Sequence, residues 1–204
     1  PVMDGLVIQR ATNASLDGGF RLANLFEILR ATTGVVSAPI LVMTYWNPVL
    51  SFGVENFARE LKAAGGAGLI TPDLIPDEAS EWLKVSDAYD LDRVFLSAPT
   101  SSPVRVQNAC ELSRGFVYAV STMGITGARD TVDNLAKQVV ANIREAAPDQ
   151  NAAVGIGIST SDQVLDVNSY ADGAIVGSAF VKAYAAGGIN ALTEMVKEIS
   201  AGLK

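Results

Sequence analysis

Short apolar runs alternate along the chain with longer amphipathic stretches, and this alternation predicts repeated strand–helix units built on a parallel sheet. One unit begins with the apolar run 40–44 and the loop sequence Tyr-Trp-Asn-Pro. It continues with a helix in which Val54, Phe57 and Leu61 share one face, and Gly65 follows as a stop signal. The repetition predicts six strands, at residues 40–44, 68–71, 93–97, 116–120, 153–157 and 173–177.

The expected helices carry start signals that place them between the strands. Ser102 before Pro103 predicts an N-cap and a first helical position, and Thr160 with Gln163 predicts a capping box. Before residue 40 the sequence predicts a loop and a single helix. The faces expected to be buried are Leu22, Leu25, Phe26 and Leu29 in that helix, and Leu135, Val139 and Ile143 in a helix over about residues 131–147.

Six parallel strands in strict alternation with helices fit either an open doubly wound sheet or a barrel. The positions of the glycines favour the barrel, because the last two strands end at Gly157 and at Gly177, and Ser178 opens a short extra helix. Phosphate sites of barrels are often built from the loops after strands seven and eight and from such a helix. We therefore expect an α/β fold, a phosphate-binding (β/α)8 TIM barrel, with six of the eight strands in this chain.

The organisation expected from this pattern is a single barrel domain over residues 1–204, incomplete at its N-terminal end. Residues 1–5 resemble the loop after a strand that the chain does not contain. Neither a linker nor a change of composition divides the sequence.

Charge and composition exclude several classes of function. The net charge of −7 argues against nucleic acid and anionic membranes as partners, since both require a basic surface. No apolar run approaches the roughly 18 to 20 residues of a membrane span, and no leader opens the chain, so we expect a cytoplasmic protein. With no histidine, Ser-His-Asp triads, Cys-His dyads and His-rich metal sites are excluded. Acid–base chemistry must come from Asp, Glu, Lys or Tyr, and the single cysteine, Cys110, is expected in the core.

The glycine-rich segment 155–160 allows two interpretations. A dinucleotide-binding loop is disfavoured, because Thr160 replaces the third glycine and no acidic residue ends a strand about 20 positions later. A phosphate cradle is favoured, since glycines let the backbone approach an anion and helix N-termini attract it. Its members would be Gly127, Gly157, Gly177 and Ser178, although the same glycines also suit tight turns.

Four further side chains lie where barrel chemistry takes place, at or just after strand ends. Asp4 and Asp73 are either functional carboxylates or turn residues. Tyr45 and Tyr118 either line the mouth of a pocket or pack at the boundary of the core.

Several segments, in order, resemble the α-subunit family of tryptophan synthase. They are residues 1–5 with 8–9, 43–48, 66–76, 114–118 with 124–128, 155–159 and 174–179. The resemblance implies retro-aldol cleavage of indole-3-glycerol phosphate to indole and glyceraldehyde 3-phosphate, with no metal or cofactor in this chain. It also implies a β-subunit partner that carries pyridoxal phosphate, in an α2β2 complex.

The same resemblance assigns roles to residues. Asp4 would hold the indole N–H and stabilise the positive charge that builds on the ring, and Tyr118 would orient the catalytic carboxylate. The indole pocket would be lined by Tyr45, Ile70 and Ile156. The phosphate would be held by Thr126, Gly127, Gly157, Gly177 and Ser178.

The chain departs from the family at two points. Leu6 replaces a proline, and the family's second carboxylate, a glutamate at the end of strand two, would precede Pro1. Asp73 belongs to a different strand and does not replace it. Either the natural protein is longer, or the chain is a weakly active member.

Two other functions remain as alternatives to cleavage of indole-3-glycerol phosphate. One is a non-catalytic module that binds phosphate or the β subunit. The other is another barrel of the pathway, such as indole-glycerol-phosphate synthase or phosphoribosylanthranilate isomerase.

Overall fold

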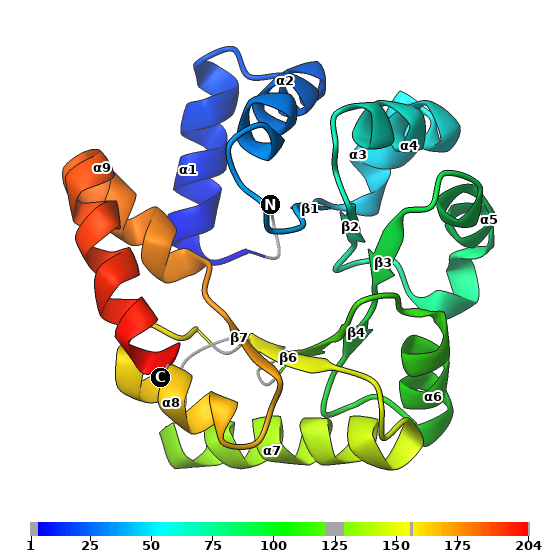
Figure 1. Ribbon diagram of the computed structural model, residues 1–204, viewed down its shortest axis with the longest axis vertical. Helices are drawn as coiled ribbons and strands as arrows, with labels where there is room; N and C mark the ends of the chain where they lie inside the picture. Colours follow the sequence, from blue (N-terminus) through cyan, green and yellow to red (C-terminus); the bar gives the residue numbers. More distant parts are fainter. Residues whose placement is uncertain (1–3, 121–128, 156, 204) are drawn as a thin grey trace.

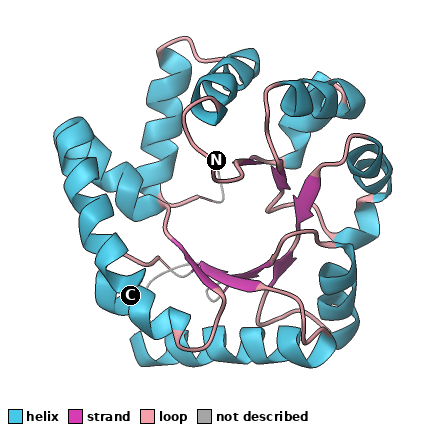
Figure 2. Ribbon diagram, in the orientation of Figure 1, coloured by secondary structure: helices cyan, strands magenta, loops and turns pink. Residues whose placement is uncertain are grey.

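The strands line the inside of a ring and the helices surround it, as the computed structural model shows (Figures 1 and 2). The structure describes residues 4–120, 129–155 and 157–203. All strand pairs are parallel and run in the order of the sequence. The helices lie only outside the strands, so the fold is a (β/α) barrel and not a doubly wound sheet.

The strands form two sheets that meet at Phe95. The first sheet contains β1 (Leu41–Met43), β2 (Gly68–Ile70) and β3 (Asp92–Val94), and the second contains β4 (Leu96–Ser97), β5 (Val117–Val120), β6 (Ala152–Gly155) and β7 (Gly173–Ile175). The predicted strand 93–97 is therefore interrupted at Phe95. The carbonyl of Phe95 still accepts a hydrogen bond from Tyr118 N at 3.0 Å, which links the two sheets.

The barrel carries a partial set of strands, as expected. In the described part of the chain no hydrogen bonds pair β7 with β1. Helix α1 (Leu6–Asp17) lies on this side of the ring and packs against α9 (Ser178–Ser200) (Figure 1).

The outer helices confirm most of the expected boundaries. They are α2 (Leu22–Thr33), α4 (Val54–Ala63), α5 (Ser80–Ala88) after a 3-10 turn (Pro76–Glu78), α6 (Pro103–Leu112), α7 (Arg129–Ala146), α8 (Ser161–Asn168), and α9, which a 3-10 turn (Ala201–Leu203) follows. Ser102 caps α6 by accepting from Arg105 N, and Thr160 and Gln163 form the predicted capping box of α8. Gly188 interrupts α9 with a φ of +64°.

Three expectations about the helices were wrong. Residues 6–17 form α1 where a loop was expected, and none of the residues of this helix is buried. The Tyr-Trp-Asn-Pro segment begins α3 (Trp46–Phe52), since Pro48 falls in the first turn, where its missing N–H does no harm. In α7, Leu135 is exposed and Ala136 is buried instead, while Val139 and Ile143 are buried as expected.

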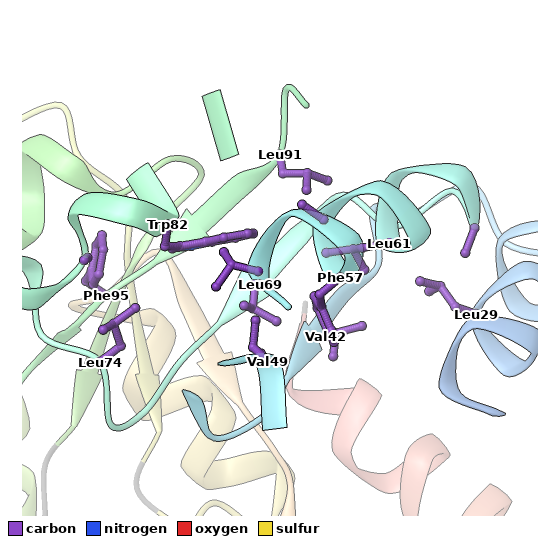
Figure 3. Close-up of a cluster of buried hydrophobic side chains, with 14 of the residues drawn as sticks. Leu29, Val42, Val49, Phe57, Leu61, Leu69, Leu74, Trp82, Leu91 and Phe95 are labelled. Carbon is purple, nitrogen blue, oxygen red and sulfur yellow. The ribbon is translucent and has the colours of Figure 1, made fainter. Parts of the chain in front are cut away.

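Two clusters of buried side chains fill the space between the strands and the helices. The first cluster joins α2, α4 and α5 to β1–β3 and includes the fully buried Phe57, Leu69 and Trp82 (Figure 3). The second joins β5 and β6 to α6, α7 and α8. The predicted face of α4 is confirmed, because Val54, Phe57, Ala58 and Leu61 are all buried. Burial of each large apolar side chain contributes about 1.5–3 kcal/mol.

At the amino-terminal end of β3, a buried guanidinium connects two helices to the sheet. The Nε of Arg93 donates to Leu112 O at 2.7 Å, and its Nη1 donates to Ser86 Oγ and to Asp87 Oδ1. Arg114 continues this network to Asp90 at 2.7 Å. These charges lie at the end of the strands where barrels carry stability and not chemistry.

Gly68 allows β2 and β3 to approach each other, and this contact supplies a test of the fold. A Cβ on Gly68 would lie 2.2 Å from the carbonyl oxygen of Asp92. We expect Gly68→Ala to lower the free energy of unfolding by about 1–3 kcal/mol, because backbone atoms must move apart. Urea unfolding measures the change. Gly173→Ala is the matched control, since Gly173 also opens a strand but its Cβ would meet only Ala153 Cβ at 3.6 Å. Equal losses in both variants would contradict this account.

Candidate active site

The predicted site residues that the structure describes gather at the carboxyl ends of the strands. Tyr45 follows β1, Ile70 ends β2, and Tyr118 lies in β5. Gly157 follows β6, while Gly177 follows β7 and Ser178 opens α9. Because all strand pairs are parallel, these strand ends meet at one end of the barrel. Thr126, Gly127 and Ile156 lie outside the described residues, so their predicted roles stay predictions.

Asp4 joins this end of the barrel through the phenol of Tyr45. The Tyr45 hydroxyl donates a hydrogen bond to Asp4 Oδ2 at 2.7 Å. The loop that carries Asp4 is also held by Gln9 of α1, whose side-chain amide donates to the Asp4 carbonyl at 2.6 Å. Asp4 and Tyr45 are 41 positions apart in the sequence, yet they form one unit in the structure.

The surroundings of Tyr45 keep it protonated. Burial, the hydrogen bond to Asp4 and the negative charges of Asp4 and Asp73 raise the pKa of Tyr45 to about 12. The phenol is therefore a hydrogen-bond donor throughout the physiological pH range. Tyr45 was predicted as a lining residue, and its contact with Asp4 adds a polar function that the sequence did not indicate.

Asp73 binds a helix N-terminus. Its two carboxylate oxygens accept from Trp46 N at 2.8 and 3.1 Å, at the first residue of α3. A carboxylate in this place satisfies a free backbone N–H and interacts favourably with the helix dipole. Of the two interpretations of Asp73, the structure supports a local structural role.

Tyr118 is half-buried, and Gly155 on the neighbouring strand makes room for it. Burial raises the pKa of the Tyr118 phenol. A Cβ on Gly155 would lie 2.1 Å from the Tyr118 hydroxyl and 2.5 Å from two of its ring carbons. No hydrogen bond joins this hydroxyl to Asp4 within the described ranges, so the orienting role of Tyr118 stays a prediction. The sequence showed Gly155 only as part of a motif.

The two glycine loops after β6 and β7 leave open space above their backbones. Gly157 has a φ of +72°, and in the described part of the chain nothing beyond the adjoining residues lies within 4 Å of a Cβ built on Gly157 or on Gly177. Gly177 is the N-cap of α9, so the free N–H groups of the first turn begin at Ser178. This arrangement suits an anion, which the helix dipole and the N–H groups would attract.

A separate open pocket of about 310 Å³ lies in the helical layer between α2 and α4. Phe26 and Phe52 form its apolar side. Arg30 and Arg59 both pair with Glu60, so its charges are largely balanced. It shares no residue with the predicted site.

Within the described ranges, no group of three or more His, Cys, Asp or Glu side chains is placed to hold a metal ion. None of the helices described has both the length and the apolar character that crossing a membrane requires.

The contact between Gly155 and Tyr118 can be tested by substitution. We expect Gly155→Ala to lower the free energy of unfolding by about 1–3 kcal/mol, since the Tyr118 ring must leave its position. Urea unfolding measures this loss, and a Tyr118→Ala chain is the control background. There the added methyl group meets no phenol and should cost less than half as much. The same cost in both backgrounds would exclude the phenol as the cause.

Comparison with known proteins identifies the family. The family model described as tryptophan synthase alpha chain matches residues 1–202. The tryptophan synthase alpha chain of Leifsonia xyli subsp. xyli is 55% identical over 202 residues, which are 99% of this chain and 77% of the relative. That of Mycobacterium avium is 50% identical over 204 residues, which are 100% of this chain and 74% of the relative.

Solved structures agree with the sequence comparison. The aminoacrylate-bound crystal structure of tryptophan synthase from M. tuberculosis superposes with a TM-score of 0.90 at 44% identity, over 100% of this chain and 77% of that chain. The tryptophan synthase a2b2 complex from Pyrococcus furiosus has a TM-score of 0.90 at 33% identity, over 100% of this chain and 82% of that chain. The chain belongs to the tryptophan synthase alpha chain family.

Proposed function

We propose that this chain works as the α subunit that cleaves indole-3-glycerol phosphate into indole and glyceraldehyde 3-phosphate. The observation that carries the proposal is the position of Asp4. Tyr45 holds its carboxylate at the same end of the barrel as the open glycine loops at Gly157 and Gly177. A substrate with an aromatic ring at one end and a phosphate at the other fits this separation of a carboxylate from an anion cradle.

The proposed chemistry uses the negative charge of Asp4. In the retro-aldol step the indole ring is protonated, the bond to the glycerol side chain breaks, and a glycerol hydroxyl loses its proton. Positive charge builds on the ring nitrogen before the bond breaks. A carboxylate placed against the N–H stabilises that charge in the transition state more than in the ground state, which accelerates the reaction. Ile70 and Ile156 would contact the ring.

The proton transfers require a second acid–base group. Positioned groups of this kind contribute about 10²- to 10⁴-fold. Asp73 is occupied by the Trp46 N–H, and no other carboxylate pairs with Asp4 in the ranges that the structure describes. We place the second carboxylate on a segment outside these 204 residues, which would lie on the side of the ring between β7 and β1.

The proposal includes a protein partner. A solved relative is described as an a2b2 complex, and this chain superposes on it over its whole length. We propose that the chain binds a β subunit, which receives the indole and carries the pyridoxal phosphate. The reaction in the α chain would then need no cofactor of its own, and we expect the complex in the cytoplasm.

A second candidate function is a non-catalytic module that binds phosphate or the β subunit. The lack of a second carboxylate near Asp4 in the described residues favours it for the chain as printed. Indole release separates the two candidates when residues 1–204 are compared with a longer chain that carries the second carboxylate, since only the first candidate predicts turnover in the longer chain. A rate near background is expected for residues 1–204, and a rate typical of enzymes would exclude both the module and the requirement for the second carboxylate.

Asp4 is tested in the complete natural α chain assembled with its β subunit. We expect Asp4→Asn to lower kcat for indole release by about 10²- to 10³-fold, because it removes charge that acts in the transition state. Affinity for an unreactive analogue with the same ring and phosphate should change much less. Asp17→Asn, at the exposed end of α1, is the matched control and should keep the original kcat. Unchanged turnover in Asp4→Asn would remove Asp4 from the mechanism.

The phosphate loops are tested with the same analogue and calorimetry. We expect Gly177→Asp to weaken binding by about tenfold or more, since it adds a negative charge and a side chain where an anion would lie. Gly34→Asp adds the same group at the exposed end of α2, where a Cβ makes ordinary contacts, and should leave binding unchanged. Full affinity in the Gly177→Asp protein would show that the phosphate lies elsewhere.

A further inference from the structure

Two sets of hydrogen bonds and one peptide bond connect the loop after β2, the start of α3 and the loop that carries Asp4. Asp73, in the loop after β2, accepts from Trp46 N with both carboxylate oxygens. Trp46 is joined directly to Tyr45, the N-cap of α3, and the Tyr45 hydroxyl donates to Asp4 at 2.7 Å. The first sheet therefore reaches the N-terminal loop through Tyr45.

We propose that Tyr45 is a positioning residue for Asp4, and that Asp73 fixes Tyr45 in place through the backbone of α3. The inference rests on the proposed function, in which Asp4 is the catalytic carboxylate. It assigns to Tyr45 a role in ordering Asp4, beyond lining the pocket.

Asp4 depends on this contact because its own segment restrains it weakly. It precedes α1, which buries none of its residues. Gln9 holds the backbone carbonyl of Asp4, which leaves the side chain free to rotate. Among the described residues, the Tyr45 phenol makes the hydrogen bond that orients the carboxylate itself.

Tyr45 is in turn supported by the rigid part of the barrel. Trp46 packs against the fully buried Trp82 of α5, with ring centroids 6.2 Å apart. Asp73 accepts hydrogen bonds from the backbone N–H of Trp46, so both the side chain and the backbone of Trp46 are held in place. A group held in this way does not have to be ordered in each catalytic cycle, which lowers the entropic cost of reaching the transition state.

The hydrogen bond from Tyr45 gives the two carboxylate oxygens of Asp4 different roles. Tyr45 occupies Oδ2 and stays protonated at physiological pH, while Oδ1 accepts no hydrogen bond within the described part of the chain. Oδ1 is therefore available to the ring N–H of the substrate. A phenol bound to Oδ2 turns Oδ1 in one direction and selects one orientation of the ring.

The test is Tyr45→Phe in the complete natural α chain with its β subunit. The ring and its packing remain, and only the hydroxyl is lost. We expect kcat for indole release to fall about tenfold or more, as a hydrogen bond to a charged group warrants, while KM changes less than threefold. Tyr89→Phe is the matched control, because the Tyr89 hydroxyl also meets a carboxylate, that of Glu55 at 3.4 Å, on the outer surface. It should keep the original kcat.

A double-mutant cycle separates positioning from a structural effect. If Tyr45 acts through Asp4, Tyr45→Phe should lower kcat by less than twofold when Asp4 is already Asn. A full additional loss in that background, an unchanged kcat in Tyr45→Phe alone, or a change confined to KM would each overturn the proposal. Unchanged turnover in Asp4→Asn is a different result, since it contradicts the proposed function itself.

Asp73 is tested by comparing two substitutions. Asp73→Asn keeps one acceptor for the Trp46 N–H and should retain most of kcat, while Asp73→Ala should lower kcat about as much as Tyr45→Phe. Combining Asp73→Ala with Tyr45→Phe should add little, because both break the same connection. Independent, multiplying losses would show that Asp73 does not act through Tyr45.

Discussion

Parallel pairing of the strands is the constraint on which the rest of this structure depends. Each strand joins its neighbour in the same direction from β1 to β7, and the hydrogen bond from Tyr118 N to Phe95 O carries the pairing across the junction of the two sheets. Parallel pairing places every carboxyl end at one end of the barrel. Residues that are far apart in the sequence, such as Tyr45 and Gly177, thereby share one surface without any direct contact.

The chain has no histidine, so an imidazole takes no part in the chemistry proposed for this surface. In the proposed function, a carboxylate and a phenol act where many enzymes use an imidazole. A phenol with a pKa of about 12 does not ionise near neutral pH, so Tyr45 keeps the proton that it donates in its hydrogen bond to Asp4. In the proposed function, Asp4 therefore acts by electrostatic stabilisation, and proton transfer falls to another group.

The sequence predicted the features that depend on interactions between residues close to one another in the chain. The apolar spacing of Val54, Phe57 and Leu61 marked a buried face, and Ser102 and Thr160 marked helix starts, because periodicity and capping act within a few residues. The barrel followed from the order of strands and glycines.

The features that escaped prediction depend on contacts between distant residues. The start of α3 relies on Asp73, 27 positions away, and the orientation of Asp4 relies on Tyr45, 41 positions away. The space at Gly155 has meaning only once Tyr118 is placed beside it. None of the residues of helix α1 is buried, and the helix packs against α9 at the other end of the chain.

The separation of the core into two clusters has a consequence for how a ligand acts on the whole molecule. The cluster around Phe57 and Trp82 supports Tyr45, and through it Asp4, while the cluster around Val117 and Ile143 supports the loops at Gly157 and Gly177. Such clusters are natural units of sub-global opening. In the proposed binding mode, Asp4, Tyr45 and Ile70 of the first unit hold the ring of the substrate together with Ile156, and the second unit holds the phosphate. The substrate then bridges the two clusters, and its cleavage into two products removes this bridge.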